Sequence, residues 1–417
     1  MHAPVRTLAV SVVLALAGIL AVAPARTGAA TAVRGFDGKT IKIGGLGSFA
    51  SYPDADVGTR ARLARANADH EVRGVTFEVT GYRDDGSSAS TASAAATALV
   101  DQDRVFAIVP DLSQFTPGDE LTRRAVPWFG WGIDASYCTT STSTSGFGFG
   151  YSGCLAPTSG GRVPATGADL FREVSGTTAN PAPTVAVVST ATDGGRRMVS
   201  ASASSLAAAG FDVVFAKGLL AVPPQPYPVA AAEELLQSHA GAPPDSIVCL
   251  ATTDCLALVQ LLRANNYLGT FVSQLYADSP VRGLLFAFAT PQYVPFTANT
   301  AAQQQLLADL HAVKADAVAT PGVVAGYLAA DMFVVAVARL RRQGTSITPR
   351  HVQQAASRMT FRRAGLYGPV KYPSAFVRSS PACGALVRDM GIAWQQVDAF
   401  ACTTKTVPLD PRFAQVY

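Results

Sequence analysis

Short strand-like segments alternate with longer helical segments along most of the chain. Residues 75–82, VTFEVTGY, alternate apolar and polar positions like a strand, and the Ala-rich segment 87–102 repeats with a helical period. The alternation restarts with TVAVVST at 184–190 and a helical pattern at 194–209. Strands separated by helices predict mostly parallel sheets with right-handed crossovers.

The pattern predicts the following elements. Strands are expected at residues 41–46, 75–82, 105–110, 126–132, 184–190, 212–220, 246–251, 270–277 and 283–289. Helices are expected from residues 54–56 to 68, at 87–102, 194–209, 228–240, 301–314 and 321–343, and around Leu256, Val259 and Leu262. A Ser/Thr/Gly-rich loop, 138–164, divides two similar units. The predicted fold class is α/β, with two Rossmann-like lobes that face each other across a cleft.

A glycine-rich turn follows the first strand. Gly45–Ala50 fits the GxGxxA spacing of a dinucleotide-binding turn, in which the helix starts within the motif. Here residues 50–54 separate the glycines from the helix. The acidic residue expected at the end of the second strand, about 20 positions on, is also misplaced, because the nearest match, Asp84-Asp85, lies about 40 residues away. We therefore predict no cofactor. The turn is interpreted as a cleft loop that offers backbone N–H groups, Ser48 and Tyr52.

Composition narrows the class of protein. Of the 417 residues, 49% are hydrophobic and 15% charged, which is typical of a folded chain with room for two lobes. The net charge is only +4 and no long basic run occurs, so we expect no nucleic-acid partner. Neither GxSxG nor a Walker sequence is present, and we predict a protein that is not an enzyme. A secreted hydrolase with an unrecognised site is the alternative.

The N-terminal residues resemble a secretory signal. Arg6 precedes an apolar stretch, residues 8–23, and small residues follow it, so residues 1–30 are predicted to be a signal peptide. The alternative is an uncleaved helix that anchors the protein, although the stretch is shorter than the ~20 residues that span a bilayer. No cysteine follows it, which argues against a lipoprotein. The expected location is extracellular or periplasmic.

An exported protein is expected to oxidise its cysteines. All six follow the signal, and closure between neighbours predicts Cys138–Cys154, Cys249–Cys255 and Cys383–Cys402. A metal site is the competing interpretation. No CxxC, HxH or HExxH occurs, so we expect no metal.

One long segment resembles a known family. The order within residues 41–113 is strand, glycine-rich turn, helix, an RG step, a strand that ends in DD, an Ala-rich helix and VFAIVP. This order is similar to that of type I periplasmic binding proteins of the leucine/isoleucine/valine-binding family. GYLAADMFVVAVARL and GLYGPVKY extend the resemblance toward the C-terminus.

The resemblance implies two lobes joined by a three-crossing hinge. It suggests residues 36–152 plus 290–365 for the first lobe and 153–289 plus 366–417 for the second. The implied function is that of an exported substrate-binding protein that closes on a small ligand, an amino acid or related compound, and delivers it to an ABC transporter permease. The alternative is a secreted ligand sensor or interaction protein of the same fold.

The family's ligand contacts fall on particular positions of this chain. The implied carboxylate contacts are Ser113 and the turn Trp131, Gly132 and Ile133, and the implied ammonium contact is Asp278. The remaining implied contacts are Asp193 and Thr253 or Asp254. Trp131 and Tyr52 are expected to supply apolar walls.

Each of these residues also has a purely structural interpretation. Ser113 is a natural helix cap, and Asp278 and Asp193 are natural turn residues. Trp131 is equally suited to the core. Asp193 stands where the family has an aromatic residue, and VPD (109–111) replaces the usual glycine after the third strand. Both differences argue against an ordinary branched-chain amino acid as the ligand.

Overall fold

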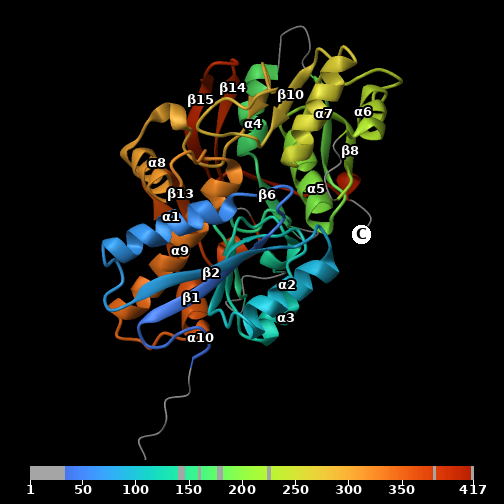
Figure 1. Ribbon diagram of the computed structural model, residues 1–417. Helices are drawn as coiled ribbons and strands as arrows, with labels where there is room; N and C mark the ends of the chain where they lie inside the picture. Colours follow the sequence, from blue (N-terminus) through green and yellow to red (C-terminus); the bar gives the residue numbers. More distant parts are fainter. Residues whose placement is uncertain are drawn as a thin grey trace, which may run out of the picture. The chain divides into compact units, whose positions relative to one another are not determined.

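The computed structural model describes residues 33–139, 146–157, 161–175, 182–222, 227–378 and 382–414. Residues from Val33 onward form one structural unit, shown in Figure 1. The predicted signal peptide, residues 1–30, lies outside the described residues.

The first sheet is entirely parallel. Its strand order is β2 (Thr76–Asp84), β1 (Thr40–Gly47), β3 (Ala107–Leu112), β4 (Trp128–Gly130) and β5 (Gly148–Gly150). One face is covered by α1 (Ala55–Ala68) and α9 (Pro321–Arg342), and the other by α2 (Ala89–Asp101) and α3 (Gly118–Arg123). Helix α1 begins after the glycine-rich turn, as predicted. Strand β5 was not predicted, because it lies within the segment that was interpreted as a loop.

The second sheet is mixed. Its order is β15 (Trp394–Thr403), β14 (Ala382–Asp389), β11 (Phe288–Ala289), β10 (Thr270–Ser273), β9 (Ser246–Cys249), β7 (Thr184–Thr190) and β8 (Asp212–Leu220). Strand β14 runs antiparallel to both of its neighbours, β11 and β15, and all other neighbouring pairs are parallel. Helices α4 (Thr166–Ser175) and α5 (Asp193–Ala208) cover one face, and α6 (Val229–Leu236) and α7 (Thr253–Ala264) the other.

Smaller elements complete the fold. Helix α8 (Ala301–Val313) packs against α1, and α10 (Pro349–Ala356) packs against α9. Two short antiparallel pairs join β12 (Thr360–Arg363) to β13 (Tyr367–Lys371) and β6 (Arg162–Pro164) to β16 (Thr406–Pro408). The strand predicted at 283–289 forms only at its end, because Leu285 and Phe286 are half-exposed and are not buried by a neighbouring strand.

Three crossings connect the two sheets, which confirms the predicted two-lobe fold. The chain passes between them after β5, after β11 and after β13. Ser152, in the first crossing, donates to Gln292 Oε1 at 2.8 Å in the second and lies 3.1 Å from the hydroxyl of Tyr367, just before the third. The crossings are therefore hydrogen-bonded to one another. We retain the lobe boundaries implied by the resemblance as a proposal.

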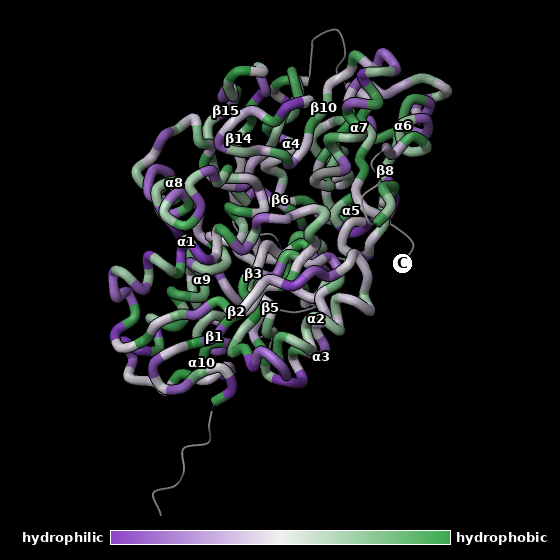
Figure 2. Tube along the Cα trace, viewed as in Figure 1, coloured by the Kyte–Doolittle hydropathy of each residue, from purple (hydrophilic) through white to green (hydrophobic). Residues whose placement is uncertain are grey.

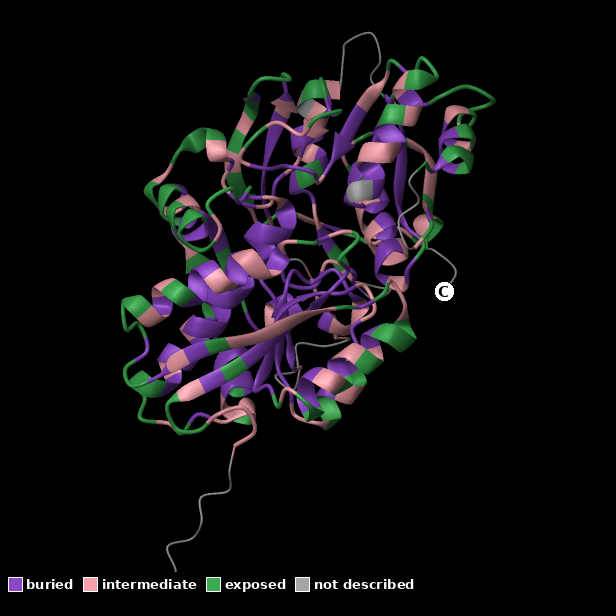
Figure 3. Cartoon of the chain, in the orientation of Figure 1, coloured by how far each residue is buried: buried purple, intermediate pink, exposed green. Residues whose placement is uncertain are grey.

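Helix α9 is the most deeply buried helix of the first lobe. Thr320 caps it by accepting from Val323 N–H at 3.3 Å, and Pro321 occupies its first turn, where no N–H partner is needed. Among the described residues it is the one helix long and apolar enough to span a membrane, but 89% of its apolar window is buried inside the protein. It is therefore a core helix, and the strands beside it are equally buried and hydrophobic (Figures 2 and 3).

A buried ion-pair network holds α1 to α9. A Cβ on Gly58 would overlap the carbonyl oxygen of Val323, so glycine lets the two helix backbones touch. Beside this contact Arg62 Nε lies 2.5 Å from Asp331 Oδ1, and each of these two side chains is only 1% exposed. The Arg62 guanidinium also donates to both oxygens of Glu71.

All three predicted disulfides are present. Cys138–Cys154 ties η1 (Ala135–Tyr137) to the first crossing, Cys249–Cys255 joins β9 to α7, and Cys383–Cys402 links β14 to β15. The last two cysteines are direct partners in the strand register. No free cysteine occurs among the described residues.

Loss of the buried guanidinium is expected to destabilise the fold. Arg62→Met leaves Asp331 buried with only Arg363, 3.7 Å away, as a cationic neighbour. The expected cost is about 3–5 kcal/mol of unfolding free energy, measured by urea denaturation.

The matched control is Arg60→Met on the same helix. Arg60 pairs with Asp56 at 2.9 Å, but its side chain is 40% exposed, so the expected cost is below about 0.5 kcal/mol. Equal losses of unfolding free energy in the two variants would contradict the conclusion that the buried ion-pair network holds α1 to α9.

Candidate functional site

The carboxyl ends of the parallel strands in both sheets lead into polar loops. In the first lobe Ser48 follows β1, Asp85 follows β2 and Ser113 follows β3. In the second lobe Thr192 follows β7 and Thr252 follows β9. Because open parallel sheets bind ligands beyond the carboxyl ends of their strands, these loops form the candidate site.

Gln114 joins the two lobes. Its side-chain oxygen accepts hydrogen bonds from Thr190 Oγ1 at 2.7 Å and from Thr192 Oγ1 at 3.1 Å. Thr192 is also the N-cap of α5. A Cβ on Gly194, in the first turn of α5, would lie 2.5 Å from the carbonyl oxygen of Ile133. The start of α5 therefore rests directly on the loops that follow β3 and β4.

Aromatic side chains occupy the hinge side of the site. Tyr52 is 5% exposed, and burial raises the pKa of its hydroxyl well above its ordinary value. Its ring centroid lies 6.1 Å from that of Trp131, which stacks at 6.2 Å on Tyr151. Trp131 Nε1 donates to Gln292 Oε1 at 3.3 Å. These rings link the cleft to the crossings.

Between these contacts lies a narrow gap of about 10 Å³. Its lining is polar apart from two side chains and consists of Ser48, Ser51, Asp85, Ser87, Gln114 and Phe115 from the first lobe and Thr190, Val222 and Asp254 from the second. A space of this size holds about one water molecule. A larger compound therefore enters only when the lobes separate, which breaks the hydrogen bonds of Gln114.

Two carboxyl groups are buried at the first-lobe edge of the site. Asp85 accepts a hydrogen bond from Ser113 Oγ at 2.8 Å, and burial raises its pKa. Asp111 accepts from Thr116 Oγ1 at 2.8 Å and from the Tyr137 hydroxyl at 2.9 Å. Burial nevertheless raises the pKa of Asp111 to about 7, because solvent does not reach its charge.

A third acid lies where the lobes meet. Burial raises the pKa of Asp134 to about 6, and the negative charge of Asp193 adds to the effect. Asp193 pairs with Arg197 at 3.0 Å, and its side chain is 44% exposed. Of these three acids only Asp85 lines the gap, where it is an acceptor for a cationic group of a ligand.

The structure brings some of the predicted contact residues together. Ser48 and Asp254 both line the gap, from opposite lobes. Tyr52 and Trp131 lie side by side at its hinge end, and Ile133 contacts the start of α5.

The other predicted contact residues lie farther from the gap. Ser113 is fully buried behind Asp85. Asp278 is half-buried, and burial raises its pKa. Gly132 has a positive φ of 96°, which fits its place in a tight turn. Thr253 is the first residue of α7, and its side chain is outside the described part of the chain.

Sequence reasoning missed two residues at the gap. Gln114 and Ser51 belong to no motif, and the structure shows that Gln114 is bonded to the second lobe and that Ser51 lines the gap. Asp85 had a usable signal, because it ends the DD pair after the second strand, where a cleft residue is expected.

Comparison with models of known protein families shows to which family the chain belongs. The model of the periplasmic binding protein family matches residues 40–379. The chain therefore belongs to the periplasmic binding protein family, as the sequence resemblance predicted. Members of this class are substrate-binding proteins rather than enzymes, and membership implies an exported protein, which fits the three disulfides. No curated protein sequence matches the chain.

Solved structures of ABC transporter binding proteins share the fold. A branched-chain amino acid ABC transporter from Thermus thermophilus with bound valine has a TM-score of 0.65 at 15% identity, covering 88% of this chain and 97% of that one. A solute-binding protein from R. palustris in complex with benzoate has a TM-score of 0.66 at 14% identity, covering 88% and 98%. A fatty acid ABC transporter substrate-binding protein from Thermomonospora curvata has a TM-score of 0.67 at 15% identity, covering 89% and 95%.

Ionisation of Asp111 is expected to destabilise the folded protein. Its pKa is raised on folding, so the folded state holds its proton more tightly than the unfolded state. The stability that this group contributes is complete below about pH 4 and is lost as the pH rises toward 7.

The isosteric variant Asp111→Asn removes this titration. The unfolding free energies of the variant and the wild type are measured by denaturation at pH 5 and pH 8. Between these pH values the wild type should lose on the order of 2–4 kcal/mol of stability relative to the variant. A difference that is the same at both pH values would show that Asp111 does not titrate in this window.

Proposed function

We propose that this protein captures a small organic compound between its lobes and presents it to an ABC transporter. The observation that carries the proposal is the Gln114 bridge, in which one amide oxygen of the first lobe binds two hydroxyls of the second. A compound that entered the gap would compete for these same groups. Its contacts with both lobes would then replace the bridge and favour the closed state. The free energy by which the compound favours the closed state is no larger than the difference between its binding free energies for the closed and open states.

The groups at the gap suit a ligand with a positive and a negative end, such as an amino acid. The hydroxyls of Ser48 and Ser51 are donors for a carboxylate, and the carboxylates of Asp85 and Asp254 are acceptors for an ammonium group. A zwitterion that leaves water needs such partners at both ends. Each charge-assisted hydrogen bond contributes about 1.5–3 kcal/mol. We therefore propose an amino acid or related compound as the ligand.

A thermal-shift screen tests the ligand class. Amino acids and small amides form the first set, and benzoate and fatty acids, named with the structurally similar binding proteins, form the second. A ligand at about 1,000 times its Kd stabilises the folded state by about 4 kcal/mol, which raises the Tm by several degrees. A response to benzoate or fatty acids alone would contradict the amino-acid assignment. No response in either set would contradict capture of a small ligand and favour a sensor or interaction protein.

Two matched variants locate the ammonium contact. Asp254→Asn is expected to weaken binding of the ligand found in the screen by about 10- to 100-fold, because one charge-assisted hydrogen bond becomes a neutral one. Asp278→Asn tests the position that the family resemblance implies. Isothermal titration calorimetry of both variants separates the two sites, and an unchanged Kd in both would remove the ammonium assignment altogether.

A further inference from the structure

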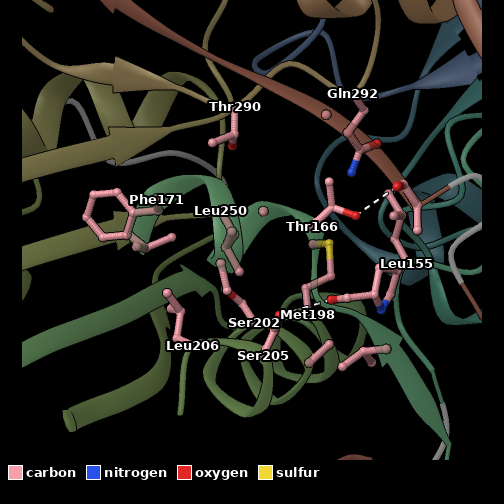
Figure 4. Close-up of a pocket in the computed structure, with 18 of the residues that line it drawn as sticks. Leu155, Thr166, Phe171, Met198, Ser202, Ser205, Leu206, Leu250, Thr290 and Gln292 are labelled. Atoms are coloured by element: carbon pink, nitrogen blue, oxygen red, sulfur yellow. Dashed lines mark hydrogen bonds between the residues drawn. The ribbon is translucent and has the colours of Figure 1, made fainter. Parts of the chain in front are cut away.

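A second cavity, apart from the gap between the lobes, lies inside the second lobe. It has a volume of about 190 Å³ and lies between helices α4 and α5 on one side and strands β9 and β10 on the other. Leu155 and Gln292, from two of the crossings, border it at the hinge end (Figure 4). Leu155, Met198 and Leu250 are each partly exposed, so solvent reaches the space.

The walls of the cavity are mostly apolar and carry no charge. Phe171, Leu206, Val248 and Val272 line it together with the polar residues Ser202 and Gln274, and none of its described lining residues is charged. The hydroxyls of Thr166 and Ser205 also border the space, but they are already bonded. Thr166 donates to the carbonyl oxygen of Ala382 at 2.7 Å and Ser205 to that of Pro164 at 3.0 Å. An ion placed here would lose its hydration without gaining a charged partner, so the lining selects neutral molecules.

Hydrogen-bonding groups gather at the hinge end. The side-chain oxygen of Gln292 is engaged by Trp131 and Ser152 of the first lobe. Its amide nitrogen lies on the side of Thr166, toward the cavity (Figure 4). Thr290 borders the same end. An amide N–H here is a donor for one oxygen of a molecule whose apolar part fills the space between the helices and the sheet.

The volume limits the size of the occupant. An apolar cavity of roughly 150 Å³ in another protein takes up benzene. Drug-sized ligands need pockets of about 300 Å³ or more. A single aromatic ring, or a branched chain of similar size, with one oxygen therefore matches the cavity.

We propose that this cavity is a second binding site, for a neutral monocyclic or short branched compound that carries one hydrogen-bond acceptor. The site is separate from the gap between the lobes, because the two share no lining residue. It also differs in chemistry, since two carboxylates border the gap and no charged side chain of the described residues borders the cavity.

Benzyl alcohol is the probe for the test, and benzoate is its charged counterpart with the same ring. Benzyl alcohol is expected to bind the wild-type protein, as followed by calorimetry and by saturation-transfer NMR. Ala201→Leu places a larger side chain in the cavity from α5 and is expected to weaken binding of benzyl alcohol at least tenfold. Ala208→Leu makes the same change at an exposed position of α5 outside the cavity and should leave the affinity unchanged.

Further variants keep the test decisive. Met198→Ala enlarges the cavity and is expected to shift preference toward 2-naphthalenemethanol, a result that does not depend on how Ala201→Leu folds. Asp254→Asn should leave benzyl alcohol binding unchanged, which separates this site from the proposed ligand site. Absence of binding to the wild type, equal affinity in Ala201→Leu and Ala208→Leu, or benzoate binding that Ala201→Leu abolishes would each overturn the proposal of a neutral-ligand site.

Discussion

The hydroxyl of Ser152 connects the three crossings on which the two-lobe architecture depends. It donates to Gln292 in the second crossing and lies within hydrogen-bond distance of Tyr367 at the start of the third. Tyr372, in the third crossing, donates to the carbonyl oxygen of Gly150 at 2.9 Å, at the end of β5. The crossings are therefore bonded to one another at the point where the chain passes between the two sheets.

Burial of carboxyl groups in the first lobe carries an electrostatic cost. Asp85, Asp111 and Asp134 are buried at the edge that meets the second lobe, and desolvation raises the pKa of each. Of the three, only Asp85 borders the gap, and a ligand cation beside it would relieve part of this cost, whereas an anion would add to it.

Much of the fold could be predicted from local sequence patterns. Strands β7 and β8 begin and end where the pattern placed them, because buried parallel strands are read as continuous β-branched runs. Strand β5, Gly-Phe-Gly, could not be recognised, since it is a strand only through its pairing with Trp128–Gly130. The β14–β15 hairpin was missed for a related reason. Its inner strand contains a glycine, and its outer strand is largely exposed, so neither shows a clear apolar pattern.

The site was less predictable than the fold, because it depends on contacts between residues far apart in the chain. The glycine-rich turn identified Ser48 as a cleft residue, and the structure places Ser48 at the gap. The role of Gln114 follows only from the approach of Thr190 and Thr192, and no local pattern encodes that approach. The apolar cavity likewise arises from the spacing of α4 and α5 above the sheet, which single-sequence patterns do not specify.

The central claim is that the lobes open to admit a compound and close around it. Spin labels at the exposed positions Ser90 on α2 and Glu233 on α6 report the distance between the lobes by pulsed electron paramagnetic resonance. The account predicts a broad, longer distance distribution without ligand and a single shorter distance when the compound that raises the Tm is added. One distance that is the same with and without that compound would contradict it.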